Sequence, residues 1–150
     1  MIEVRCPTEV DTHRVAGRLS ATLQPGDIVV LAGPLGSGKT LFTQGLAAGL
    51  GVDEPVVSPS FVLMRQYRSG FIPIVHVDVY RLGSLNEFED LDAFDLASDG
   101  VLVIEWGDAV EGVLPPDHLH IDFFVEDDGT RVLKLTPGGF WRSRNLDALV

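Results

Sequence analysis

The segment at residues 28–50 constrains the fold more than any other part of the sequence. An unbroken apolar run, IVVLA, leads into GPLGSGKT at residues 33–40, and a helical pattern follows at residues 39–50. The eight residues match G-x-x-x-x-G-K-[ST], the loop that joins a buried strand to a helix and cradles phosphates with backbone N–H groups. The positive end of the following helix adds to this attraction. The segment therefore predicts a nucleotide site in an α/β fold.

Two side chains of this loop have expected roles. Lys39 is placed to reach the outer phosphates, and the Thr40 hydroxyl is placed to coordinate Mg²⁺. The chain has only two lysines, Lys39 and Lys134, so a lysine at this position of a glycine loop is difficult to attribute to chance. A merely flexible turn is the alternative, and the flanking patterns argue against it. The loop thus predicts a nucleoside triphosphate with Mg²⁺.

The rest of the chain alternates between apolar runs and helical patterns. Expected strands lie at residues 2–5, 28–33, 61–67, 71–80 and 101–106, expected helices at 8–23, 39–50 and 84–98, and an expected C-terminal β-hairpin around EDDGT. Interleaved strands and helices favour an α/β class with a P-loop NTPase-like central, mainly parallel sheet flanked by helices. No repeat or linker interrupts residues 1–150, so we expect one domain.

The first expected helix has a recognisable start and an apolar face. Either Thr8 or Asp11 is suited to cap it. Its expected core-facing residues recur at roughly helical spacing: Val10, Val15, Leu19 and Leu23.

The charge balance limits the kinds of partner. Asp and Glu number 22 against 11 Lys and Arg, for a net charge of −11. A phosphate backbone would be repelled by most of such a surface, which argues against a stand-alone nucleic-acid binder. A single cysteine, Cys6, excludes an internal disulfide and suits a reducing compartment. With no apolar run long enough to span a membrane, and no leader pattern, the expected location is the cytoplasm.

Two carboxylates lie at the ends of expected strands. In IVHVDVYR, alternation places His76, Asp78 and Tyr80 on one face, with valines on the other. Glu105 ends the apolar strand VLVIE. A Mg²⁺–phosphate site usually takes one further carboxylate from such a strand end. The alternative is that each acid is simply solvated.

Several weaker candidates remain open. The SPSF segment at residues 58–61 fits either a switch that senses the terminal phosphate or a turn before a strand. His118 and His120 share a strand face but lack a third ligand for zinc. The acidic residues between 87 and 99 form either a solvated helix face or a docking surface. The tail at 138–150 either covers the core or contacts a partner.

Taken in chain order, these motifs resemble the TsaE (YjeE) family of small bacterial ATPases of the tRNA threonylcarbamoyladenosine pathway. The resemblance runs from about residue 26 to 135. It rests on five segments in order: GPLGSGKT, SPSF, HVDVYR at 76–81, IEW at 104–106 and LPPDHLHIDF at 114–123. The loop alone is shared by many ATPases, and the ordered set is far more specific.

The resemblance implies a set of site residues. The phosphate-cradling run corresponds to Gly36, Ser37, Gly38, Lys39, Thr40 and Leu41. Thr40 and Glu105 resemble the family's Mg²⁺ ligands, and Asp78 resembles the acid beside the metal and γ-phosphate. The remaining matches are Ser58 and Ser60 at the switch position, Arg131 near the nucleotide, and Thr8 or Glu9 near the base. Trp106 is interpreted as a packing residue. Many relatives have Thr or Lys before the switch serine, where this chain has Val57.

The family's role implies ATP hydrolysis coupled to the complex that transfers a threonylcarbamoyl group to the adenosine beside the anticodon. The implied cofactors are ATP and Mg²⁺, and the implied partners are a heterodimer of TsaB- and TsaD-type proteins, with tRNA reached only through them. Three rivals remain: a small-molecule kinase, a GTP-dependent switch and a nucleotide-binding scaffold with negligible turnover. The sequence shows no clear arginine-bearing lid of the kind that small-molecule kinases use. It also lacks the N-K-x-D motif by which GTP-dependent switches read guanine.

Overall fold

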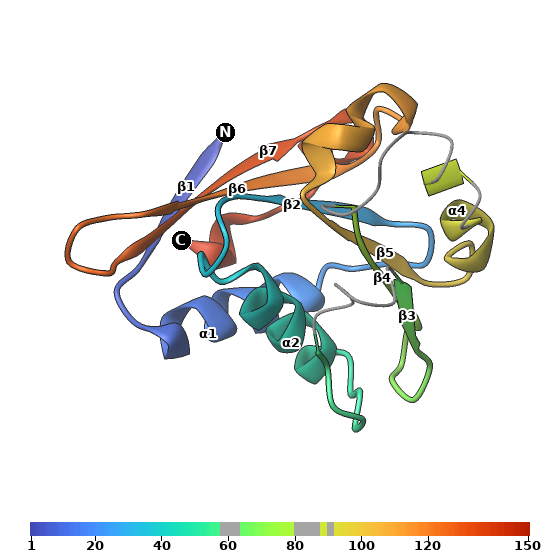
Figure 1. Ribbon diagram of the computed structural model, residues 1–150, viewed down its shortest axis with the longest axis horizontal. Coiled ribbons are helices and arrows are strands. Elements are labelled where there is room, and N and C mark those ends of the chain that lie inside the picture. Colours follow the sequence, from blue (N-terminus) through green and yellow to red (C-terminus); the bar gives the residue numbers. More distant parts are fainter. Residues whose placement is uncertain (58–63, 80–87, 90–91) are drawn as a thin grey trace.

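The computed structural model describes residues 1–57, 64–79, 88–89 and 92–150. Within these ranges one mixed sheet has seven strands in the order β1-β7-β6-β2-β5-β4-β3 (Figure 1). The strands are β1 Ile2–Cys6, β2 Ile28–Ala32, β3 Met64–Tyr67, β4 Ile74–Asp78, β5 Val101–Glu105, β6 Leu119–Val125 and β7 Arg131–Pro137. The helices are α1 Glu9–Ser20, α2 Lys39–Gly49 and α4 Ala93–Leu96, with 3₁₀ turns η1 Gly107–Val113, η2 Gly139–Ser143 and η3 Asp147–Leu149.

The centre of the sheet is parallel, as the sequence predicts. Strand β2 pairs in parallel with β5 and β6, and β5 pairs in parallel with β4. The flanking pairs β1–β7, β6–β7 and β3–β4 are antiparallel, and β6 with β7 forms the expected C-terminal hairpin. Because the carboxyl ends of β2, β4 and β5 meet at one edge, the residues after these strands lie close together in space.

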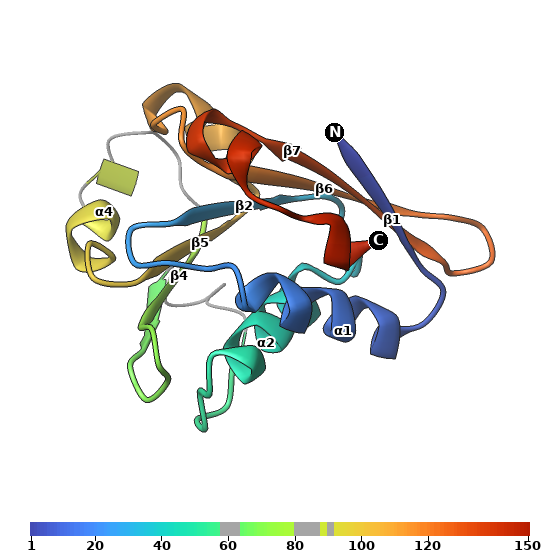
Figure 2. The ribbon, with the colours of Figure 1, turned by 180° about the vertical axis from the view of Figure 1, so that it is seen from behind.

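Alternating side chains place the two faces of the sheet in two hydrophobic cores. Val29 and Leu31 of β2 face a core shared with α1 and α2, whereas Ile28 and Val30 face a core shared with α4 and η1. Burial on both sides explains why the strand is an unbroken apolar run rather than an alternating one. Figures 1 and 2 show α1 and α2 side by side on the same side of the sheet.

Helix α1 begins with a capping box. The Thr8 hydroxyl accepts a hydrogen bond from the Asp11 backbone N–H, and the Asp11 carboxylate accepts one from the Thr8 backbone N–H. Both predicted caps therefore take part. The prediction that Val10 faces the core is wrong, since its side chain is 66% exposed. Five residues of helix turn Val10 about 140° away from the buried Val15.

The acidic segment differs from the single helix expected at 84–98. Its residues 84–87 and 90–91 lie outside the described ranges. Asp92 has a positive φ of 53°, so α4 starts after it and is only four residues long. Asp95 is exposed while Ala93 and Ala97 are buried, and Asp99 pairs with the exposed Arg68. The described part of this segment thus presents its acids to solvent.

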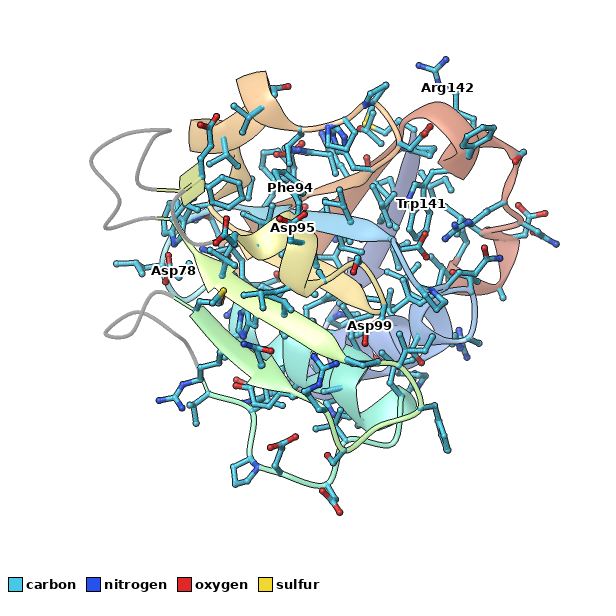
Figure 3. The ribbon with its side chains drawn as sticks, turned by 90° about the vertical axis from the view of Figure 1, so that its right-hand side faces the viewer. Asp78, Phe94, Asp95, Asp99, Trp141 and Arg142 are labelled. Atoms are coloured by element: carbon cyan, nitrogen blue, oxygen red, sulfur yellow. The ribbon has the colours of Figure 1, made fainter. Side chains whose placement is uncertain are left out.

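The C-terminal tail covers the core on the α1 side. Trp141, Leu146 and Leu149 are almost fully buried, and Figure 3 shows Trp141 inside the molecule with Arg142 pointing outward. The tail is also anchored by Arg144, whose guanidinium donates to both carboxylate oxygens of Asp27 at 2.6 and 2.7 Å. No helix among the described residues is long and apolar enough to cross a membrane.

Candidate nucleotide site

A cavity of about 500 Å³ lies where the carboxyl ends of β4 and β5 meet the start of α2. Its walls bring together residues far apart in the chain: Pro7, Thr8, Glu9, Thr12, Leu35, Gly36, Gly38, Lys39, Thr40, Leu41, Asp78, Glu105, Trp106, Gly129 and Arg131. Most of the residues selected from the sequence are among them. The predicted Ser58 and Ser60 lie outside the described residues. The cavity is therefore the candidate site.

Glycines let the loop between β2 and α2 take its shape. Gly38 has a φ of +107° and directly precedes the first residue of α2, a conformation that other residues rarely adopt. A Cβ on Gly33 would lie 2.8 Å from the Cβ of Phe123, so only glycine fits between the loop and β6. The loop is thus packed onto the neighbouring strand while its backbone lines the cavity.

Ser37 lies within the loop but beneath its surface. Its side chain is fully buried, and its hydroxyl has no hydrogen-bond partner among the described residues. The contact of Ser37 with phosphate stays a prediction, and it would have to be made by the backbone because the side chain is buried.

Lys39 is buried against the loop and an aromatic ring. Its ammonium group donates to the carbonyl oxygens of Gly33 at 2.6 Å and Pro34 at 3.0 Å, and lies 3.8 Å from the centroid of the Trp106 ring. Burial lowers the pKa of Lys39, and the nearby carboxylates of Glu105 and, less strongly, Asp78 act in the opposite direction. The side chain is a desolvated cation at the cavity wall, where its attraction for phosphate is strong.

Trp106 is a wall residue that sequence reasoning assigned to packing alone. It follows Glu105 directly, and its positive φ of 64° turns the chain at the end of β5. This turn lets the indole reach Lys39. The sequence signal was its position immediately after a strand-end acid, but the left-handed turn is visible only in the structure.

The two strand-end acids lie side by side. Asp78 pairs in register with Glu105 across β4 and β5, and Glu105 lies on the face of β5 that also carries Val101 and Val103. This is the face covered by α2, so Glu105 Oε1 accepts a hydrogen bond from the Thr40 hydroxyl at 3.1 Å. Figure 3 shows Asp78 and Asp99 at opposite ends of this part of the sheet.

Glu105 has a second contact within the sheet. Its Oε2 lies 2.6 Å from Nε2 of His76, and both side chains are buried, with 4% and 0% of their surface exposed. His76 lies on β4 two residues before Asp78, so it is a diagonal neighbour of Glu105. Sequence reasoning placed His76 on the same face as Asp78 but gave it no role.

Arg131 lines the cavity and holds the loop. From the first residue of β7, its guanidinium donates to the carbonyl oxygens of Ser37 at 3.1 Å, Gly36 at 3.0 Å and Gly129 at 2.7 Å. A residue more than 90 positions away in the chain thereby fixes the outer side of the loop. The carbonyls of Gly36 and Ser37 therefore face Arg131.

The start of α1 forms the opposite wall. Thr8 and Glu9, which are predicted to lie near the base, line the cavity together with Pro7 and Thr12, which sequence reasoning missed. Thr12 lies one helical turn after Thr8, and that spacing was the available signal. Its side chain is fully buried.

The chemistry of the wall fits a nucleotide phosphate with Mg²⁺. Thr40 and Glu105 supply a hydroxyl and a carboxylate oxygen, the hard donors that Mg²⁺ takes in small number alongside phosphate oxygens. No group of three or more His, Cys, Asp or Glu side chains suited to a metal occurs in the part of the chain that the structure describes. A metal at Thr40 and Glu105 would thus need oxygens from its nucleotide, and Lys39 lines the same cavity.

The fold and this loop define a P-loop type of α/β protein, and comparison with known proteins specifies the family. The family model for the threonylcarbamoyl adenosine biosynthesis protein TsaE matches residues 6–133. The chain belongs to the TsaE family.

Individual relatives agree with this assignment. The tRNA threonylcarbamoyladenosine biosynthesis protein TsaE of Streptomyces coelicolor is 44% identical over 140 residues, covering 88% of this chain and 95% of the relative. The protein of the same name from Treponema pallidum is 46% identical, covering 81% and 90%. The crystal structure of Bacillus subtilis YdiB superimposes with a TM-score of 0.81 at 32% identity, covering 99% of this chain and 93% of that one.

Proposed function

We propose that the chain is a Mg²⁺-dependent ATPase required for threonylcarbamoyladenosine modification of tRNA. The observation that carries the proposal is the convergence of Lys39, Thr40, Asp78 and Glu105 on one cavity wall. These four residues come from the loop and from two separate strands, and they combine a cation with hard oxygen donors. Membership of the TsaE family supports the biological process.

Each residue on the wall has a defined task in this proposal. The loop N–H groups bind the phosphates, and Lys39 exchanges its contacts with the Gly33 and Pro34 carbonyls for the outer phosphate oxygens. Thr40 and Glu105 hold Mg²⁺, which when bound would neutralise charge on the phosphate oxygens. Asp78 either orients the attacking water or supports the metal's water shell.

ATP is preferred to GTP in the proposal because the sequence lacks an Asn-Lys pair and so has no N-K-x-D motif for guanine. The contacts of Arg131 argue against a kinase. Its contacts go to loop carbonyls, whereas a kinase lid brings arginine donors over the phosphates.

The acidic charge supports action through partners. A net charge of −11 opposes direct binding of tRNA, so we propose that the chain associates with a heterodimer of TsaB- and TsaD-type proteins when ATP is bound. In this scheme ATP orders the 58–61 segment and the acidic 84–98 segment against the partners, and hydrolysis resets them. Ser58 and Ser60 remain predicted switch residues.

The proposal is tested by ATP turnover of the purified protein, alone and with the partner heterodimer and tRNA. We expect turnover that the partners stimulate and that Glu105→Ala abolishes, because the variant removes a metal ligand. Asp122→Ala is the matched control, since it removes an acid of β6 outside the cavity and should leave stimulation intact. A rate of ATP turnover that the partners do not change would contradict the proposal and would favour the kinase alternative.

A further inference from the structure

A buried histidine lies directly behind the proposed metal ligand Glu105. His76, in the middle of β4, is fully buried, and its Nε2 lies 2.6 Å from Glu105 Oε2. The ring also packs near Tyr67, with centroids 6.5 Å apart. Its other nitrogen, Nδ1, has no hydrogen-bond partner among the described residues. The polar contact of this imidazole is thus with Glu105.

The direction of this hydrogen bond follows from the chemistry of the two groups. An ionised carboxylate has only acceptors, so Nε2 must carry the proton and donate. A short hydrogen bond to an ionised acceptor is about twice as strong as a neutral one, and burial strengthens it further. His76 is therefore a strong, directional anchor for one oxygen of Glu105.

The other oxygen is held from the opposite side. Glu105 Oε1 accepts from Thr40, the second proposed metal ligand. With both oxygens held, the carboxylate cannot rotate freely, and its plane is fixed relative to the loop. Without the His76 contact, Glu105 would keep only the Thr40 anchor and could adopt other rotamers.

We propose that His76 is a positioning residue for the metal site, which orients Glu105 and so raises the affinity for the Mg²⁺–nucleotide complex. The inference rests on the proposed function, because it needs Glu105 to be a metal ligand. His76 acts through Glu105 rather than as a ligand itself, since Glu105 lines the cavity and His76 does not. Hydrogen-bond partners that orient a ligand typically contribute 10- to 100-fold in metal affinity.

The chain contains a matched control pair. His120 Nε2 lies 3.0 Å from Asp122 Oδ1 on β6, with 18% and 41% of the two side chains exposed. Neither residue lines the cavity. Removing His120 therefore removes the same kind of contact from the same sheet without touching the proposed site.

The test compares nucleotide binding with and without metal by calorimetric titration of a non-hydrolysable ATP analogue, in Mg²⁺ and in EDTA. His76→Leu fills the space but has no donor, and His76→Gln places an amide N–H where Nε2 lies. Mg²⁺ raises the affinity for the nucleotide above its value in EDTA, and we expect this increase to be 10- to 100-fold smaller in His76→Leu than in wild type. The affinity in EDTA should be unchanged. His76→Gln should recover most of that gain, and His120→Leu should match wild type.

Direct binding of Mn²⁺ to the protein–nucleotide complex, followed by electron paramagnetic resonance, should rank the variants in the same order. A Mg²⁺-dependent gain equal to wild type in His76→Leu would overturn the inference alone. No Mg²⁺-dependent gain in wild type would overturn the proposed function and the inference with it. If His76→Leu does not fold, His76→Asn replaces it: its amide is one bond too short to reach Glu105, so wild-type gain in that variant would equally overturn the inference.

Discussion

The cavity wall and the β6–β7 hairpin contain the same kinds of polar contact in different surroundings. The two lysines of the chain both lie over aromatic rings: Lys39 is 3.8 Å from the Trp106 centroid, and Lys134 is 4.8 Å from the Phe124 centroid. Lys39 is only 5% exposed, whereas Lys134 is partly exposed. The ring of Phe124, beneath Lys134, is itself 47% exposed.

The same contrast holds for the two histidine–carboxylate pairs. His76 and Glu105 are buried at 2.6 Å, and His120 and Asp122 are partly exposed at 3.0 Å. Exposed polar pairs contribute little because water competes for both partners, whereas buried pairs depend on each other. The comparison teaches that residue types alone do not mark the site, and that burial together with convergence on one cavity does.

The largest expected effect extends this contrast to a pair outside the site. Arg144 and Asp27 anchor the C-terminal tail with 18% and 8% of their side chains exposed, whereas Arg68 and Asp99 are more than half exposed. Asp27→Ala leaves a largely buried guanidinium without its carboxylate, so we expect a loss of about 3 kcal/mol in the free energy of unfolding. Asp99→Ala should cost about 1 kcal/mol or less. Urea unfolding of both variants measures the difference. Equal losses in the free energy of unfolding would contradict the claim that burial decides how much an ion pair contributes.

The second prediction compares the two lysines. Lys39→Met keeps the length of the side chain but removes its charge, so the affinity for ATP should fall by about 1.5–3 kcal/mol, or roughly 10- to 150-fold. Lys134→Met removes the other lysine and should leave the affinity within about twofold of wild type. Calorimetric titration with Mg²⁺–ATP checks both. A comparable loss in Lys134→Met would show that general charge, rather than the cavity, attracts the nucleotide.

The smallest expected effect concerns stability without nucleotide. Burial lowers the pKa of Lys39 below its ordinary value of 10.5, so the unfolded chain binds more protons than the folded chain between those two pKa values. Below the lowered pKa, the cost of burying the ammonium group is fully present, and Lys39→Met should be more stable than wild type. As the pH rises through the window, wild type loses this cost and the difference should shrink.

Unfolding of the two proteins at a series of pH values from 6 to 10 measures that difference. A stability advantage of Lys39→Met that stays constant or grows with pH would show that the ammonium group is not disfavoured by its surroundings. The comparison of the buried Lys39 with the partly exposed Lys134 would then need another physical basis.

Much of the fold and the wall of the site could be predicted from the sequence because local patterns specify them. The G-x-x-x-x-G-K-[ST] spacing located Lys39 and Thr40 between a strand and a helix, and alternation placed Asp78 on one face of β4. Parallel neighbours then bring the ends of the strands together, so Asp78 and Glu105 meet in register. The choice of these residues needed only residue types and their spacing, whereas the register that pairs Asp78 with Glu105 is seen only in the structure.

What the sequence could not supply depends on contacts between distant segments. Arg131 reaches loop carbonyls more than 90 residues away, and Trp106 reaches Lys39 only because the backbone turns at a positive φ. The position of Val10 was misjudged because its five-residue spacing from Val15 departs from the helical period. The covering role of the tail, with Trp141 in the core, left no periodic signal.

The most direct test of the central claim is a crystal structure of the protein with a non-hydrolysable ATP analogue and Mg²⁺. The account predicts phosphates cradled by the 33–40 loop, Lys39 withdrawn from the Gly33 carbonyl to the outer phosphate, and Mg²⁺ bound through Thr40 and Glu105. A nucleotide seated elsewhere, or a metal bound away from both residues, would contradict the account.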